Sequence, residues 1–294
     1  MADFRIQATV GQGGDNRAND CKLICALLNV YARKKGKDTV EIKKKADSDV
    51  ITAIEGFQKD QLGMDKPDGR VDVGAGTWRE LNRVLKSTRT TKSITPPENG
   101  VITWKAEGNE GGPFHSRILH VPSQWSGLTL GRGYDMKYRE KAAIVSALTK
   151  VGVNGDKAKR ISHGAGKSGG KARQVIIDQD LLDFEISPKG QLQLFEQVYG
   201  EYVERAKRLS LTNRYAKKYK KTEWGSLNPK IKNVLVDLTY RGDYRPDTMK
   251  FLQKHVSNND FSKFKIELEK RGNWSNVPEN RFQARVSYLN EGSG

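Results

Sequence analysis

Three carboxylates surround a glycine-rich stretch near the middle of the chain, which reads GLTLGRGYD from Gly127 to Asp135. Glu107 and Glu110 precede this stretch, and Asp135 closes it. Enzymes that hydrolyse glycosidic bonds use two such groups, an acid that protonates the leaving oxygen and a carboxylate that activates water or stabilises the developing cation. The pattern therefore favours glycoside hydrolysis, with one of the two glutamates as the candidate acid and Asp135 as the candidate second carboxylate.

Local sequence distinguishes the two glutamates. Glu107 stands at the predicted end of a short helix, TWKAEG, close to Trp104 and Ala106, and apolar neighbours help to keep a carboxyl group protonated for acid catalysis. Glu110 stands in NEGG, which is typical of a loop, so we prefer Glu107 as the acid. Alternating residues in GLTLGRGYD predict a small hairpin whose glycines leave room for a substrate.

The elements that must position these groups are mainly helices. Apolar side chains recur at helical spacing in seven segments beyond the short one at Glu107. These segments are residues 19–36, 50–63, 76–86, 136–152, 187–210, 227–242 and 260–272. The fold class that we expect is mainly α, with a three-helix bundle at the N-terminus followed by an α+β domain that contains the hairpin.

Capping residues mark the ends of several of these helices. Asn19 or Asp20 is expected to start the first helix, and Gly36 to end it. Asp49 is expected to start the second helix. Two later starts are marked by the pairs Ser187-Pro188 and Asn228-Pro229.

A Ser/Thr/Pro-rich stretch of low hydrophobicity, STRTTKSITPPENG, separates the third helix from the carboxylates. Such composition is typical of a boundary between domains. We therefore expect an N-terminal domain over residues 1–90, a linker over 91–100 and a C-terminal domain over 101–294.

The chain carries a formal net charge of +17, most of it beyond residue 95. This charge favours a polyanionic partner, which leaves nucleic acid, an anionic membrane face and a bacterial envelope open, as it does a simply well-solvated surface. Residues 205–221 concentrate the charge, with eight basic residues, two tyrosines and no acidic residue. For this basic segment we weigh attraction to envelope anions such as lipopolysaccharide equally with a solvated helix face, and we expect no nucleic acid.

No apolar run is long enough to span a membrane, and the N-terminus does not resemble an ordinary signal peptide. Cys21 and Cys25 lie one helical turn apart, a spacing that suits two buried thiols better than a disulfide. None of the four histidines has a metal-ligand spacing, so we expect no metal. The glycine-rich segment at residues 164–172 lacks a phosphate-loop glycine, since Ile161 stands in its place, and we expect a surface loop and no cofactor.

The segment AIEGFQKDQLGMDKPDGRVDVGAGTWREL resembles the peptidoglycan-binding domain found on many cell-wall hydrolases. The shared pattern is a helix with FQ, a PDG turn and a helix with T...L, and the resemblance covers about residues 8–86. It implies a three-helix module that binds peptidoglycan. The alternative is a generic three-helix bundle without a ligand.

AEG followed by SGLTLGRGYD is similar to the phage-type lysozyme superfamily, and most closely to the pesticin-like muramidases, over about residues 100–290. The resemblance implies that Glu107 is the general acid, that Asp135 orients or deprotonates water, and that Thr129 helps to hold that water. Arg132 departs from many relatives and puts an extra cation beside the cleft. We therefore expect substrate contacts from this arginine and from two tyrosines, Tyr134 and Tyr240.

These resemblances together imply a phage endolysin that hydrolyses the β-1,4 bond between N-acetylmuramic acid and N-acetylglucosamine. We expect single displacement with inversion, a monomer without cofactor, synthesis in the host cytoplasm and action on the wall in the periplasm. Two alternatives stay open. One is a lytic transglycosylase, which can work with one glutamate, and the other is a non-catalytic wall-binding or virion structural protein.

Overall fold

The computed structural model describes residues 4–89, 94–111 and 115–291, and these residues are predominantly helical. The expectation of a mainly α fold with a small β-hairpin is confirmed. The chain forms two compact units. Unit 1 contains Met1–Ser93 and Asn109–Gln191, and unit 2 contains Ile94–Gly108 and Leu192–Gly294. The domain boundary at residues 91–100 stays a prediction, because unit 1 takes up a further stretch of chain beyond it.

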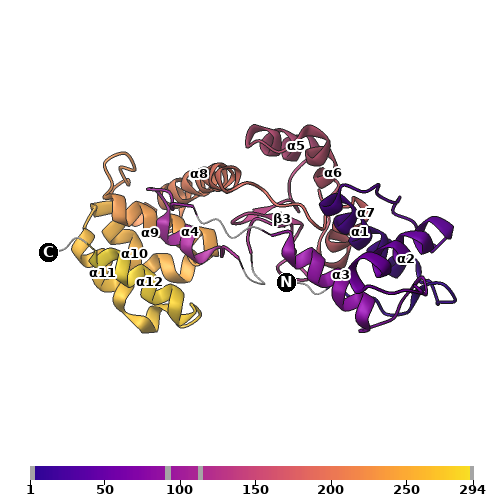
Figure 1. Cartoon of the computed structure of the whole chain (residues 1–294). Helices are drawn as coiled ribbons and strands as arrows, with labels where there is room; N and C mark the ends of the chain where they lie inside the picture. Colours follow the sequence, from indigo (N-terminus) through magenta and orange to yellow (C-terminus); the bar gives the residue numbers. More distant parts are fainter. Residues whose placement is uncertain (1–3, 90–93, 112–114, 292–294) are drawn as a thin grey trace. The chain divides into compact units, whose positions relative to one another are not determined.

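The first half of unit 1 is a three-helix bundle, as the apolar spacing predicts (Figure 1). Its helices are α1 (Ala18–Lys35), α2 (Ser48–Leu62) and α3 (Gly76–Ser87). Helix α1 packs against both of the others. Ile24, Phe57 and Leu81, one from each helix, are fully buried at the centre, so the three apolar stripes share one core.

In the bundle, the predicted C-terminal end of α1 is confirmed, whereas the predicted N-terminal caps of α1 and α2 are wrong. Gly36 ends α1 in the left-handed conformation, as predicted. Neither Asn19 nor Asp20 caps α1, because the Asp20 carboxylate instead accepts hydrogen bonds from the backbone amides of residues 7 and 8. Helix α2 is capped by Asp47 and not by Asp49, since the Asp47 side chain accepts from the amide of Val50.

Two short strands, β1 (Val10–Gly11) and β2 (Arg70–Val71), were not predicted and form an antiparallel pair. The side chain of Gln58, buried on α2, fixes the turn before β2. Its Nε2 donates to the carbonyl of Arg70 at 2.9 Å, and its Oε1 accepts from the amide of Gly69 at 3.0 Å. The glutamine of the FQ motif therefore holds the PDG turn against the bundle.

The second half of unit 1 contains the hairpin and three helices. The hairpin strands are β3 (Thr129–Leu130) and β4 (Tyr134–Asp135). The helices are α5 (Lys141–Lys150), α6 (Gly155–Ser162) and α7 (Gly169–Asp178). Helix α5 begins at Lys141 and not at residue 136. Helix α7 packs on α1, where Lys22 donates to Asp178 at 2.6 Å, so the bundle and the hairpin half form one body.

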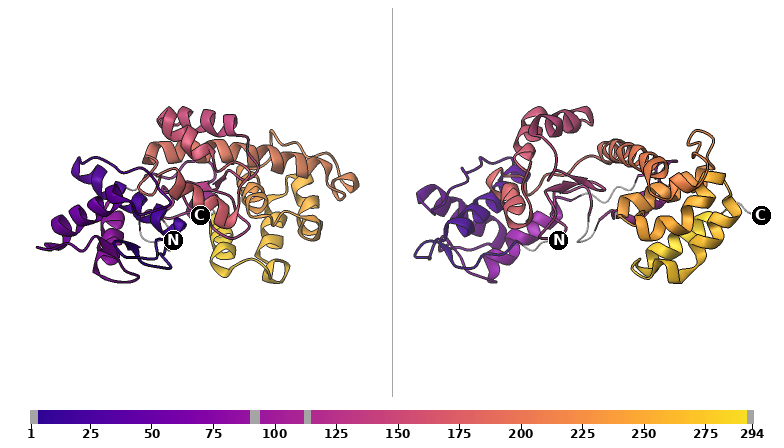
Figure 2. Two further views of the ribbon diagram at one scale, coloured as in Figure 1. Left: turned by 90° about the vertical axis from the view of Figure 1, so that its right-hand side faces the viewer. Right: turned by 180° about the vertical axis from the view of Figure 1, so that it is seen from behind.

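Unit 2 is helical in the residues that the structure describes (Figures 1 and 2). It contains α4 (Val101–Ala106), most of α8 (Pro188–Thr212), η1 (Ala216–Lys218), α9 (Pro229–Arg241), α10 (Pro246–Asn258), α11 (Phe261–Glu269), η2 (Arg271–Trp274) and α12 (Glu279–Asn290). Asn228 caps α9 by accepting from the amide of Lys230, as predicted. Leu235 and Phe264 belong to a core shared by α9 to α12.

Three further expectations concern the described residues. Cys21 and Cys25 are buried free thiols, as their spacing predicts, and burial raises the pKa of Cys25 to about 11. Within residues 4–89, 94–111 and 115–291, no helix combines the length and apolar character needed to cross a membrane. The basic segment runs from the last turns of α8 through η1, and all of its basic residues except Lys207 are exposed.

Candidate functional site

The hairpin places Thr129 and Asp135 directly opposite each other across an antiparallel pair, with Leu130 opposite Tyr134. The turn between the strands requires glycine, because Gly131 and Gly133 have positive φ angles of 61° and 90°. The hairpin predicted from GLTLGRGYD is therefore confirmed. Its register also brings two of the predicted catalytic residues together.

Two backbone amides hold the Asp135 carboxylate. The amide of Gly127 donates to Oδ2 at 3.1 Å, and the amide of Lys137 donates to Oδ1 at 2.8 Å. A side chain at residue 127 would collide with the carboxylate, since a Cβ there would lie 2.2 Å from Oδ1 of Asp135. Gly127 is thus needed for the close approach, and the half-buried carboxylate has one fixed orientation.

Thr129, the residue opposite Asp135 in the hairpin, is only 4% exposed. Its hydroxyl donates to the carbonyl of Gly127 at 3.2 Å. Its backbone exchanges two hydrogen bonds with His120, at 3.0 and 2.8 Å. Burial lowers the pKa of His120, and the negative charge of Asp135 partly opposes that shift. Sequence reasoning missed His120, because residue 120 lies outside the glycine-rich stretch and carries no motif of its own.

The hairpin residues expected to contact substrate are buried in the described conformation. Arg132 is 4% exposed, and its Nη2 donates to Oε1 of Glu110 at 3.2 Å. Tyr134 is 2% exposed, and the guanidinium of Arg139 lies 4.4 Å from its ring centroid. The extra cation of the hairpin therefore faces a carboxylate of its own unit. Substrate contacts from the two residues stay predictions.

Glu110 belongs to a cluster of buried charges. Its carboxylate accepts from Arg117, from Arg132 and, at 2.6 Å, from Nε2 of Gln191. Arg117 is fully buried and also donates to Oε1 of Glu185 at 2.8 Å. These hydrogen bonds tie the carboxylate to three buried or partly buried side chains, which suits a structural role.

Glu107 lies in unit 2 at the end of α4, as the sequence predicts. Its Oε1 accepts from Nη1 of Arg281 at 2.9 Å, and its side chain is 26% exposed. Burial raises the pKa of Tyr240, and the negative charge of nearby Glu107 raises it further. The ring of Tyr240 stacks on Tyr202 with centroids 4.2 Å apart. Glu107 and Tyr240, predicted separately, are thus brought together.

A network of buried ion pairs holds Arg281, the partner of Glu107, in place. Asp237 on α9 is fully buried and accepts from Nη2 of Arg281 at 2.5 Å, from Nε of Arg285 at 2.7 Å and from the hydroxyl of Thr103 at 2.9 Å. Burial alone would raise the pKa of Asp237, but the two guanidinium groups lower it below its usual value. The network fastens α4, α9 and α12 together and so fixes where Glu107 stands.

Sequence reasoning missed this network, although a signal for it exists. Arg281 and Arg285 are four residues apart on α12 and therefore lie on the same helix face. Asp237 stands in VLVDLTY, of which residues 234–239 are all buried. A lone acid in an apolar helix face predicts a basic partner, since buried charges are paired.

The predicted residues thus form two groups, Thr129 with Asp135 in unit 1, and Glu107 with Tyr240 in unit 2. No cluster of three or more metal-ligating side chains is present in the described part of the chain. No curated protein matches the sequence. The family model described as "Domain of unknown function (DUF8812)" matches residues 100–286, a span that contains both groups. The chain therefore belongs to the DUF8812 family of domains of unknown function.

Proposed function

We propose that this chain is an endolysin, a cell-wall hydrolase that cleaves the β-1,4 bond between N-acetylmuramic acid and N-acetylglucosamine. Glu107 protonates the leaving oxygen, Asp135 activates the attacking water, and Thr129 helps to hold that water. The observation that carries the proposal is the hairpin, which sets a threonine opposite a carboxylate whose orientation two amides fix. Such a preorganised carboxylate suits a general base.

The surroundings of Glu107 support its role as the acid over Glu110. Arg281 occupies Oε1 of Glu107, whereas Oε2 makes no hydrogen bond to the residues that the structure describes. That second oxygen is available to carry and deliver a proton. Both oxygens of Glu110, in contrast, accept hydrogen bonds from buried donors.

The wider proposal follows the resemblances. The second part of the chain is a lysozyme-like domain, and the N-terminal bundle binds peptidoglycan. The enzyme acts as a monomer without a cofactor, by single displacement with inversion. It is made in the host cytoplasm and reaches the wall at lysis, where the exposed basic segment at residues 205–221 favours contact with anionic lipopolysaccharide.

A turbidity assay on Gram-negative cells stripped of their outer membrane tests the proposal. Glu107→Gln should lower the clearing rate by about 10²- to 10⁴-fold, because the amide cannot donate the catalytic proton. Glu140→Gln is the matched control, because Glu140 is exposed and its substitution changes the charge by the same amount. Clearing by Glu107→Gln at the wild-type rate would remove Glu107 from the mechanism.

Product analysis separates the alternatives. Hydrolysis yields a reducing muramic acid end, and its initial anomer, read by proton NMR, reports inversion or retention. A 1,6-anhydro-muramic acid end would instead identify a lytic transglycosylase. Binding to sacculi with no new reducing ends would identify a wall-binding or structural protein.

A further inference from the structure

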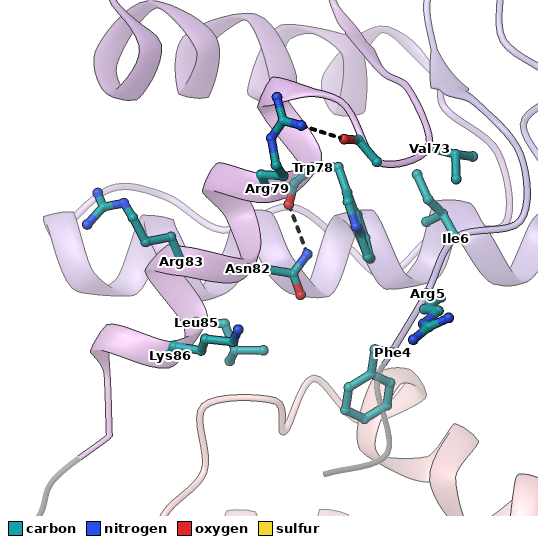
Figure 3. A pocket seen from close by; sticks show the side chains of 11 residues that line it. Phe4, Arg5, Ile6, Val73, Trp78, Arg79, Asn82, Arg83, Leu85 and Lys86 are labelled. Carbon is teal, nitrogen blue, oxygen red and sulfur yellow. Dashed lines mark hydrogen bonds between the residues drawn. The ribbon is translucent and has the colours of Figure 1, made fainter. Parts of the chain in front are cut away.

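A pocket of about 820 Å³ opens beside α3 in unit 1 (Figure 3). Helix α3 forms one wall, and the extended residues 4–6 with the loop at residues 73–74 form the other. Its volume lies within the range of sites that hold small organic molecules. The pocket is in the N-terminal bundle, so neither group of predicted catalytic residues contributes to it.

One face of α3 supplies an aromatic ring, an amide and two cations to this pocket. Trp78, Asn82, Leu85 and Lys86 follow one another at helical spacing, and Arg79 stands beside them. The partly exposed ring of Trp78 projects from α3 toward Ile6 and Val73 (Figure 3). A flat indole with an accessible face suits the C–H surface of a sugar ring.

The charges that line the pocket are all positive, from Arg5, Arg79, Arg83 and Lys86. Arg83 is neutralised by Glu80, which accepts from its Nε at 2.7 Å and its Nη2 at 2.5 Å. Arg79 donates only to the carbonyl of Gly74, at 3.2 Å, and neither Arg79 nor Lys86 forms an ion pair with the described residues. Their uncompensated charge favours a ligand that carries a carboxylate.

Asn82 adds a polar group at the middle of the pocket. Its Nδ2 donates to the carbonyl of Trp78 at 2.9 Å, which fixes the amide plane (Figure 3). Its Oδ1 makes no hydrogen bond within the described part of the chain. An oriented acceptor next to an aromatic face is suited to the N–H of an acetamido group.

We infer that this pocket is the peptidoglycan-binding site of the chain, an inference that rests on the proposed function. An N-acetylated sugar stacks on Trp78, its acetamido N–H donates to Asn82, and carboxylates of the lactyl group or stem peptide meet Arg79 and Lys86. The pocket is partly open, and its two aromatic rings, Phe4 and the partly exposed Trp78, belong to opposite walls and do not follow one another along a groove. Single-stranded nucleic acid instead needs a groove with successive aromatic platforms, so the geometry favours the muropeptide.

The test measures binding of the full-length chain by calorimetry to three probes, a disaccharide-tetrapeptide muropeptide, chitotetraose and a single-stranded DNA oligonucleotide. Trp78→Ala should weaken the muropeptide and chitotetraose about tenfold each, because both lose the stacking surface. Trp78→Phe should restore most of the affinity. Lys86→Gln should weaken only the muropeptide, because chitotetraose has no carboxylate.

Lys59→Gln is the matched control for charge, since Lys59 is exposed on α2 of the same bundle and lies outside the pocket. Equal muropeptide affinity of wild type and Trp78→Ala would overturn the inference, as would tighter binding of DNA than of muropeptide. Thermal melts exclude unfolding as the cause of any loss. Binding that depends on Trp78 without wall hydrolysis would contradict the proposed reaction and support the binding site. Wall hydrolysis without binding that depends on Trp78 would support the reaction and contradict the site.

Discussion

Thr129 and Asp135 are joined through one residue, because the hydroxyl of Thr129 donates to the carbonyl of Gly127 while the amide of Gly127 donates to the Asp135 carboxylate. A single peptide segment therefore orients both side chains. The two proposed water-binding groups cannot be displaced independently, and residue 127 controls their geometry.

Gly127→Ala should disrupt this arrangement without unfolding the chain. The new Cβ would lie 2.2 Å from Oδ1 of Asp135 and 2.6 Å from the amide of Lys137, so the carboxylate must move. A displacement of about 1 Å costs on the order of 10²-fold in rate. The clearing assay measures this loss. Gly170→Ala is the control, since no atom lies within 4 Å of its Cβ, and an equal loss in both variants would contradict the prediction.

Thr129→Val should lower kcat on soluble muropeptide chains with little change in KM. Valine keeps the shape of threonine but removes the hydroxyl that, as proposed, holds the attacking water. We expect a loss of about tenfold to 10²-fold. Thr129→Ser keeps the hydroxyl and should retain most of the rate. If serine and valine reduce kcat equally, packing and not the hydroxyl accounts for the effect, because Thr129 is almost fully buried.

Asp237→Asn should lower the free energy of unfolding of the chain by about 3–5 kcal/mol, because it leaves Arg281 and Arg285 buried without their shared carboxylate. Urea denaturation monitored by fluorescence measures the change. A loss below 1 kcal/mol would show that solvent or other acids replace Asp237. Asp247→Asn is a suitable control, since its ion pair with Arg245 is exposed.

The same network predicts a pH dependence of stability. The pKa of Asp237 is lower in the folded state than its ordinary value of 3.8, so the unfolded chain takes up the proton first as acid is added. The contribution of Asp237 is complete above pH 3.8 and is lost as the pH falls through the lower folded pKa. Between pH 5 and 2, wild type should therefore lose stability more steeply than Asp237→Asn. Parallel slopes would contradict this prediction.

Two glycines, one packed against the ring of Tyr199 and one that follows Tyr199 in the sequence, should respond oppositely to alanine. Gly100 has a φ of 80°, and its Cβ would lie 2.4 Å from the ring of Tyr199, so Gly100→Ala should destabilise the chain by about 1–3 kcal/mol. Gly200 lies inside α8 with no atom within 4 Å of its Cβ, and Gly200→Ala should stabilise by about 0.5–1 kcal/mol. Thermal melts measure both, and shifts of the same sign would contradict the steric argument.

Local signals in the sequence predict much of the fold. The apolar spacing of the bundle helices, Gly36 at a helix end and Asn228 at a helix start depend on neighbouring residues alone, and each is confirmed. The hairpin register also follows from local glycines. The prediction of Asp20 and Asp49 as caps is wrong, because the choice among nearby polar residues depends on contacts that local sequence does not show, such as the amides that Asp20 binds.

Contacts between residues that are far apart in the sequence were not predicted. The pair β1–β2 is two residues long on each side, too short to show alternation. His120 and the burial of Arg132 depend on tertiary packing, as does the contact of Glu107 with Arg281, which is 174 residues away. Composition identified Arg132 as a cation but could not show that Glu110 is its partner.

The distance in sequence between Glu107 and Arg281 has a consequence for synthesis of the chain. Because the ion pair needs α12, a nascent polypeptide exposes Glu107 from the ribosome well before its partner exists. At translation speeds of about 5–20 residues per second, the 174-residue interval lasts roughly 9–35 s. The carboxyl group proposed as the acid therefore reaches its final setting only after Arg281 has been synthesised.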